Sequence, residues 1–173
     1  GVAALAIGSP AGRGESIEGR DSIVLENGKV RLVLDLGGGS IGSFRFKGEE
    51  MNPLSWNAPA RGDTSVHGFG HFLCLDRWGP PSEAEGAHGM PYHGEASNVS
   101  WQAVRSPTTT PDGAIEAVMT ALLPKAGLGV RRTVRLSGKA AVLTVHEKVT
   151  NRNLLGRLYN MVQHATIAPP FLD

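Results

Sequence analysis

The first part of the chain alternates apolar and polar residues in the way that β-strands do. Asn27-Gly28 separates two such stretches, and this dipeptide is the strongest short signal for a β-hairpin turn. After it, Val30, Leu32 and Leu34 fall on one face of a strand, because successive side chains of a strand point to opposite sides. The pattern predicts three strands, over residues 22–26, 29–36 and 40–47.

The second half of the chain repeats this pattern. Apolar and β-branched stretches are separated by short turn sequences, and residues 136–140 read as the turn of a second hairpin. We expect further strands over residues 99–104, 114–123, 130–136, 141–150 and 158–165. About eight or nine strands joined by short loops predict an all-β fold.

Residues 52–98 break the pattern. This segment has little periodicity, yet it holds five of the 11 prolines, four of the six histidines and two of the three tryptophans. A long irregular segment inside a compact domain is usually functional or disordered. Its histidine and aromatic content favours a functional role.

The composition agrees with strands and turns. Glycine accounts for 23 of the 173 residues and proline for 11, which excludes a helical bundle because both residues destabilise helix interiors. A hydrophobic content of 40% excludes collagen-like and disordered chains and is sufficient for a packed core. The length is that of one domain or a large part of one.

Charge and cysteine content narrow the class of partner. The chain has 17 basic and 16 acidic residues in an interspersed order, a net charge of +1, so we expect no nucleic-acid partner. No stretch approaches the roughly 18–20 apolar residues of a membrane span. Cys74 is the single cysteine, which excludes an internal disulfide and a cysteine-based zinc site.

The first twenty residues differ in composition from the rest of the chain. A small apolar start gives way to a segment rich in glycine, serine and charge that runs to Arg20. We expect residues 1–20 to be a flexible leader or the remnant of an export signal or of cloning, and residues 21–173 to be the folded domain. The apolar start favours a periplasmic or secreted location over a cytoplasmic one.

The glycine-rich stretch over residues 37–42 fits the dinucleotide-binding pattern G-x-G-x-x-G. That site requires a helix directly after the glycines. Here a strand pattern with Phe44 and Phe46 follows, so we interpret the stretch as a β-turn.

The histidines leave three interpretations open. His67 and His71 have a spacing that would place both on one face of a helix for zinc, but the glycines between them disfavour a helix. His88 and His93, near Glu95, could contribute to a metal site or merely bond to the backbone. The third interpretation is a polar pocket for a hydroxyl-rich ligand, since aromatic faces pack on a sugar and polar groups select its hydroxyls.

Three ordered segments resemble the aldose 1-epimerase, or galactose mutarotase-like, superfamily, most closely its hexose-6-phosphate mutarotase branch. The central segment runs from Gly70-His71-Phe72-Leu73-Cys74-Leu75-Asp76-Arg77-Trp78-Gly79-Pro80 through Ala87-His88-Gly89-Met90 to Trp101. The family has there a Trp-Phe-Gly-Pro element, then His-Gly-Phe-Ala-Arg, and a tryptophan about eight residues later. The flanking segments lie over residues 27–50 and 149–165.

The resemblance implies a galactose mutarotase-like antiparallel β-sandwich and the interconversion of hexose anomers by acid/base ring opening. His164 would be the general acid, and His88 would polarise the sugar near the ring oxygen and C1. Arg77 and His93 would contact hydroxyls, Trp78 would be a platform for the ring, and His71 is a further candidate for a sugar contact. The reaction needs no metal or organic cofactor.

Departures from the family pattern modify this expectation. The arginine of the family motif falls on Tyr92, which favours an unphosphorylated sugar. The family's catalytic glutamate lies beyond Asp173, so we expect the chain to be a fragment. The carboxylates near the loops do not single out a base: Asp76, Glu83, Glu85 and Glu95.

Two alternatives to a mutarotase remain, a non-catalytic carbohydrate-binding β-sandwich module and a histidine metal site. Because fold does not determine function, the same scaffold can serve sugar recognition without turnover. Open sheet edges invite association, so we also expect the chain to form a homodimer or to aggregate.

Overall fold

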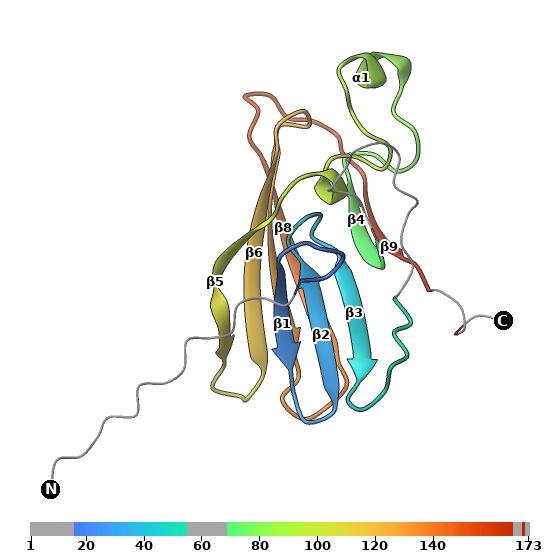
Figure 1. The fold of residues 1–173 in the computed structure, drawn as a ribbon. Coiled ribbons are helices and arrows are strands. Elements are labelled where there is room, and N and C mark those ends of the chain that lie inside the picture. The colour runs from blue at the N-terminus through green and yellow to red at the C-terminus, as the bar shows by residue number, and fades with distance from the viewer. Residues whose placement is uncertain (1–15, 55–68, 168–170, 172–173) are drawn as a thin grey trace, which may run out of the picture.

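The computed structural model describes residues 16–54, 69–167 and 171, and it confirms the predicted all-β antiparallel sandwich (Figure 1). One sheet has the order β1-β2-β3-β4-β9, with bounds β1 Ser22–Glu26, β2 Val30–Asp35, β3 Ile41–Phe46, β4 His71–Leu75 and β9 Met161–Ala165. The other has the order β5-β6-β7-β8, with bounds β5 Gln102–Thr109, β6 Ile115–Leu123, β7 Leu128–Leu136 and β8 Leu143–Asn151.

Two short helices interrupt the strands, the α-helix α1 at Glu83–Ala87 and the 3-10 helix η1 at Ala96–Asn98. Figure 1 shows α1 on an excursion of the chain that extends past the end of β4. No helix in the described ranges is long and apolar enough to cross a membrane.

The predicted Asn27-Gly28 turn joins β1 and β2. The Asn27 side-chain oxygen accepts hydrogen bonds from the backbone N–H groups of Lys29 and Val30 at 2.7 and 2.8 Å. Its amide nitrogen donates to the carbonyls of Ser137 and Ala140, in the turn between β7 and β8. One side chain therefore shapes its own hairpin and ties it to a turn of the opposite sheet.

The core lies between the two sheets. The inward residues of the first sheet include Leu25, Leu32 and Leu34, and those of the second include Met119 and Leu136, all almost fully buried. Burial of such side chains contributes roughly 1.5–3 kcal/mol each relative to exposure. The apolar positions of the alternating sequence pattern are thus the positions whose side chains fill the space between the sheets.

A buried ion pair also lies in the core. The Arg132 guanidinium on β7 pairs with Glu147 on β8 at 2.6 Å, and their side chains are 2% and 5% exposed. The same guanidinium donates to the carbonyl of Gly39 and lies 4.6 Å from the centre of the Trp101 ring. The charge is thereby paired and hydrogen-bonded, which a buried charge requires.

The glycine-rich stretch is the turn between β2 and β3, as predicted. Asp35 ends β2, and its carboxylate accepts hydrogen bonds from the N–H groups of Gly37 and Gly38 at 2.8 and 2.6 Å. Gly39 has a φ of +69°, and a Cβ there would lie 2.3 Å from the Trp101 ring. Close packing on an indole therefore explains this glycine, and no dinucleotide-binding helix follows.

The described part of the expected leader packs on the domain. Ile17 and Arg20 form a small antiparallel bridge, and the buried Arg20 guanidinium pairs with Asp35 at 3.1 Å. It also lies 4.4 Å from the centre of the Phe69 ring. Residues 1–15 fall outside the described ranges.

Most predicted strands are confirmed within a few residues. The strand expected over residues 99–104 is instead β5, which begins at Gln102 and continues through Pro107. The sequence pattern does not predict β4, which lies within residues 52–98. Its run of apolar residues is too short to show whether it has the periodicity of a strand or of a helix.

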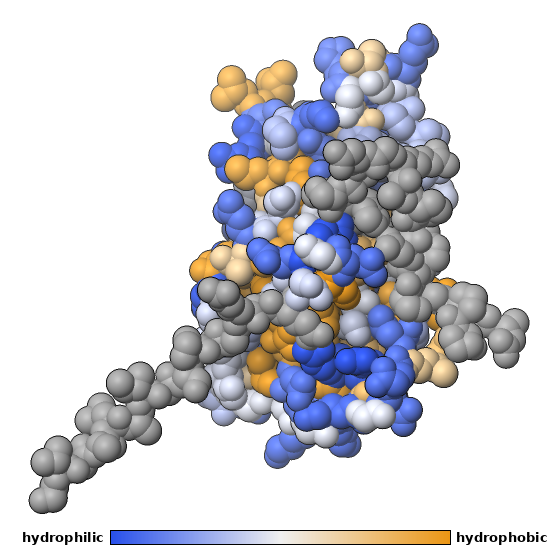
Figure 2. Space-filling model, viewed as in Figure 1, coloured by the Kyte–Doolittle hydropathy of each residue, from blue (hydrophilic) through white to orange (hydrophobic). Residues whose placement is uncertain are grey.

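The connection between β8 and β9 exposes apolar side chains. Leu154, Leu155 and Leu158 are each at least 80% exposed in this connection. Figure 2 shows an apolar projection at the end of the molecule where this connection turns in Figure 1. Large exposed apolar side chains gathered in one segment are typical of contact surfaces.

Candidate functional site

The candidate site lies on the outer face of the β4–β9 pair. Leu73 and Leu75 of β4 belong to the core, so Phe72, the residue before Leu73, points to the opposite face of the sheet. Phe72 pairs directly with His164 of β9, and cross-strand partners share a face. Their rings are stacked with centroids 4.5 Å apart, which holds the His164 imidazole on the aromatic face.

A loop brings His93 to the same place. Its ring centroid lies 5.2 Å from that of His164 and 5.9 Å from that of Phe72. Trp78 and Tyr92 complete the group, and their ring centroids lie 6.3 and 4.3 Å from that of His93. We call these five residues the histidine cluster.

The backbone positions His93 by an unusual conformation. His93 and Gly94 both have positive φ, +65° and +79°, and Gly94 forms a bridge with Leu75 at the end of β4. A Cβ at Gly94 would lie 2.2 Å from the Leu75 carbonyl oxygen, so only glycine fits. A non-glycine residue with positive φ is strained, and such strain concentrates at functional sites.

The hydrogen bond to His93 determines its tautomer. The Gly79 backbone N–H donates to His93 Nδ1 at 3.0 Å, so in the neutral ring Nδ1 is the acceptor and Nε2 carries the proton. Burial lowers the pKa of His93, and the neighbouring His164 lowers it further. His93 is therefore held as a neutral donor. His164 has its Nδ1 3.0 Å from Thr166 Oγ1, which orients that ring.

The exposed rings suit the apolar face of a sugar. Trp78 and Tyr92 are 58% and 59% exposed, although both belong to residue types that are usually well buried. An aromatic ring with a polar tip packs on C–H groups while its N–H or O–H remains available for hydroxyls. Together with two imidazoles, the cluster offers stacking surfaces and proton-transfer groups side by side.

His88, which the sequence analysis also places at the site, lies apart from the histidine cluster. It caps the C-terminal end of α1, where its Nδ1 bonds the Ala84 carbonyl at 2.8 Å, and it makes no ring contact with the cluster in the part of the chain described. Both His88 and His93 precede a glycine in the sequence.

Arg77 does not face the cluster as a free guanidinium. It forms an ion pair with Glu85 of α1, and this carboxylate also accepts bonds from the Ser82 backbone N–H and hydroxyl in a capping box. The bond from Arg77 lowers the pKa of Glu85 to about 2, with the Ser82 bonds contributing. The pair fixes α1 to the strand end, which is a structural role.

His71 lies on β4 but on its core-facing side, because it alternates with Phe72. Its Nε2 is 3.1 Å from Gln163 Oε1, and the Gln163 amide donates to Glu147, the partner of Arg132. Burial lowers the pKa of His71, partly offset by the Gln163 bond. His71 is thus linked, through the exposed Gln163 side chain, to the buried Arg132–Glu147 pair.

The carboxylates near the loops are mostly engaged. Glu95 is buried and accepts a hydrogen bond from the Ala126 N–H at 2.7 Å. Asp76 pairs with Arg157 at 2.6 Å, and Glu85 with Arg77. In the described ranges, no three His, Cys, Asp or Glu side chains are grouped so that they could hold a metal ion. His67 falls outside those ranges.

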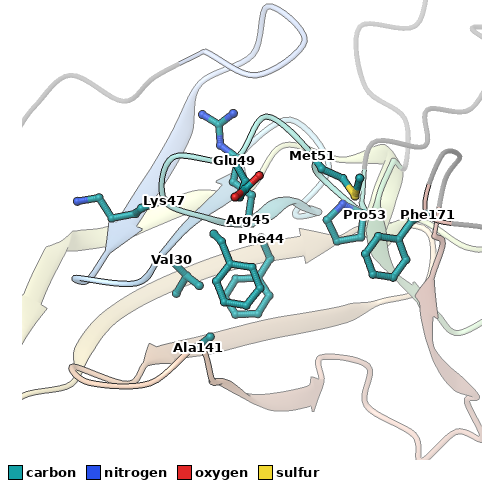
Figure 3. A pocket seen from close by; sticks show the side chains of 10 residues that line it. Val30, Phe44, Arg45, Lys47, Glu49, Met51, Pro53, Ala141 and Phe171 are labelled. Atoms are coloured by element: carbon teal, nitrogen blue, oxygen red, sulfur yellow. The ribbon is translucent and has the colours of Figure 1, made fainter.

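A larger cavity of about 660 Å³ lies at the β3 side of the sandwich (Figure 3). Its lining is mainly apolar, with Phe44, Met51 and Phe171 among the side chains, and charged groups are contributed by Arg45, Lys47 and Glu49. Among its described lining residues there is no histidine, so these residues do not offer the neutral-pH proton-transfer group that the histidine cluster provides.

The fold is that of the mutarotase-like β-sandwiches. A solved structure with this fold is that of YeaD from Salmonella typhimurium, a proposed mutarotase, which superimposes with a TM-score of 0.51 at 20% sequence identity. The match covers 70% of this chain, and the chain spans 42% of the length of YeaD. No protein-family model and no curated protein matches the sequence.

Sequence reasoning placed His164, His93 and Trp78 at one site, and the structure brings these three together. It omitted Phe72, Tyr92 and Thr166. The aromatic residues carry a readable signal, since Phe72 alternates with core residues and Tyr92 adjoins His93. The Gly79 and Thr166 bonds depend on the folded backbone and have no signal in the sequence.

Proposed function

We propose that this protein binds an unphosphorylated hexose at the histidine cluster and interconverts its α and β anomers by acid/base ring opening. The observation that carries the proposal is the pairing of two imidazoles of fixed orientation, 5.2 Å apart between centroids, with exposed aromatic rings beside them. The mutarotase-like fold supports it. Tyr92, at the position where the resemblance places the family arginine, supports a sugar without phosphate.

In this proposal His164 protonates the ring oxygen as the bond between C1 and the ring oxygen breaks, and a base removes the proton of the C1 hydroxyl. His93, a neutral Nε2–H donor, polarises an oxygen of the sugar. The C1–C2 bond then rotates, and the ring closes on the other face with the proton transfers reversed. A positioned proton-transfer group contributes about 10²–10⁴-fold to the rate. The engaged carboxylates described above are not assigned as the base.

The second candidate function is sugar binding without turnover. The observation that favours it is the engagement of Asp76, Glu85 and Glu95 in structural contacts. A cluster that lacks a base would bind a hexose through its rings and imidazoles and leave the anomers at their spontaneous rate.

Proton NMR of freshly dissolved α-glucose and α-galactose tests both candidates. A mutarotase accelerates the appearance of the β anomer, and His164→Ala or His93→Gln lowers this acceleration by about 10²-fold or more. His146→Gln, on the exposed face of β8, is the matched control and retains the rate. Line broadening of one sugar without acceleration identifies a binding module. The absence of both acceleration and line broadening with both sugars would contradict both candidates.

A further inference from the structure

A second cavity, of about 280 Å³, lies beside α1 and apart from the histidine cluster in its lining residues. α1 and the turn after it contribute Glu85, His88 and Met90. Lys125 enters from the β6–β7 turn, and Arg157 from the β8–β9 connection. Asp76, directly after β4, forms part of the wall. Three separate connections and a strand end thus converge on one small space.

Asp76 is the feature that points to a ligand. Its side chain is 3% exposed, and Oδ1 accepts a hydrogen bond from Arg157 at 2.6 Å. Its Oδ2 is buried and has no hydrogen-bond partner in the described part of the chain. An unsatisfied buried carboxylate oxygen is costly, so it marks a position where a donor from outside the chain would bind favourably.

Lys125 and His88 define what else the ligand must offer. The Lys125 ammonium reaches across to the turn after α1, where it would lie 3.4 Å from a Cβ at Gly89, and it makes no ion pair within the described ranges. His88 donates its Nδ1 proton to the Ala84 carbonyl, so in the neutral ring Nε2 is an acceptor. The cavity therefore presents one unpaired cation and two acceptors.

We propose that this cavity is a second binding site, for a small polyhydroxy carboxylate such as a sugar acid. Lys125 pairs with the carboxylate, while Asp76 Oδ2 and His88 Nε2 accept hydrogen bonds from hydroxyls. A neutral sugar leaves Lys125 unpaired, and a simple carboxylate leaves Asp76 Oδ2 unsatisfied. The volume, at the lower end of the range for small-molecule sites, favours a single sugar unit over a nucleotide or an oligosaccharide. The proposal is independent of turnover at the histidine cluster.

Titration of the ¹⁵N-labelled protein with gluconate, glucose and acetate tests the proposal by amide NMR. Gluconate is expected to give saturable shifts of the amides of Gly86, Gly89 and Lys125. Lys125→Met should weaken gluconate binding about tenfold or more, because it removes a charge-assisted hydrogen bond. Lys139→Met is the matched control, since Lys139 is exposed in the β7–β8 turn at the other end of the sheet. It should leave the affinity unchanged.

Three results would overturn the proposal. The first is the absence of saturable shifts with gluconate while the spectrum of the protein remains that of the folded chain. The second is equal affinity for acetate and gluconate, which would indicate contact with the charge alone. The third is an unchanged gluconate affinity in Lys125→Met. Asp76→Asn, which keeps the shape of the side chain, provides a further variant, and it should also weaken gluconate binding.

Discussion

His93 combines three constraints in one residue. Its backbone has a positive φ, its Nδ1 accepts the Gly79 N–H bond, and its ring lies against His164 and Phe72. These contacts all favour the neutral imidazole, because burial and the neighbouring His164 disfavour a second proton. A neutral donor at fixed orientation is suited to polarise a sugar oxygen over the whole physiological pH range.

The same contacts make stability depend on pH. Because the pKa of His93 lies below 6.5 in the folded state, the unfolded chain binds more protons as the pH falls through 6.5. Folding stability should therefore decrease on acidification. We expect a lower urea midpoint at about pH 5.5 than at about pH 7.5, and a smaller difference between them in His93→Gln. A pH dependence that is identical in the variant would show that His93 does not contribute.

At the scale of elements, the excursion between β4 and η1 carries both candidate sites. The chain leaves β4 at Asp76, whose φ is +78°, and returns at His93 and Gly94, which also have positive φ. The Arg77–Glu85 pair holds α1 to the start of the excursion. The Gly94–Leu75 bridge holds its end against the strand. Left-handed residues at both ends let a long segment begin and end at the same strand terminus.

Gly94→Ala should disrupt this return. The added Cβ meets the Leu75 carbonyl oxygen at 2.2 Å, so the bridge must open and His93 must move. We expect a loss of roughly 3 kcal/mol or more in unfolding free energy, measured by urea denaturation. The control is Gly113→Ala, which has a φ of +82° but no atom within 4 Å of the new Cβ. That variant should lose only about 1–2 kcal/mol from backbone strain. Equal losses would mean that the contact with Leu75 is unimportant.

How far the sequence predicts these elements depends on the kind of signal. Strands with alternating patterns, such as β2 and β6, are predictable because one face is buried. β4 is not, because its apolar run has no visible period, and β5 is displaced because its residues are mostly exposed. At the site, His88 and His93 both precede a glycine. The choice between them depends on the Leu75 bridge and the Gly79 bond, which form only in the folded chain.

On the scale of the whole molecule, the edge strands differ in how they are protected from pairing with another chain. β5 carries Pro107, which has no N–H to offer, and two register shifts, and both features discourage pairing with another chain. β8 and β9 are regular, and β8 has half-buried inward residues such as Val145. The connection between them exposes Leu154 and Leu155. Association should therefore occur through this side of the sandwich.

Light scattering at increasing concentration tests this expectation. The protein should form dimers or larger species, and the combined Leu154→Lys and Leu155→Lys changes should shift it toward monomer, because the exposed apolar surface becomes charged. Val104→Lys, an exposed apolar position on β5, is the control and should have no such effect. A monodisperse monomer at high concentration would contradict the expectation.

The pairing of β4 has a consequence for motion. β4 shares one register pair with β3, Ile41 with His71, but five with β9, from His71–Ala165 to Leu75–Met161. The β4–β9 ribbon is therefore attached to the rest of its sheet by a narrow seam. Local opening follows the boundary with the fewest hydrogen bonds, so this ribbon should swing as a unit and exchange its amide protons sooner than β1–β3. Because Phe72 and His164 lie on opposite strands of the ribbon, such a swing carries them together and leaves their stacking intact.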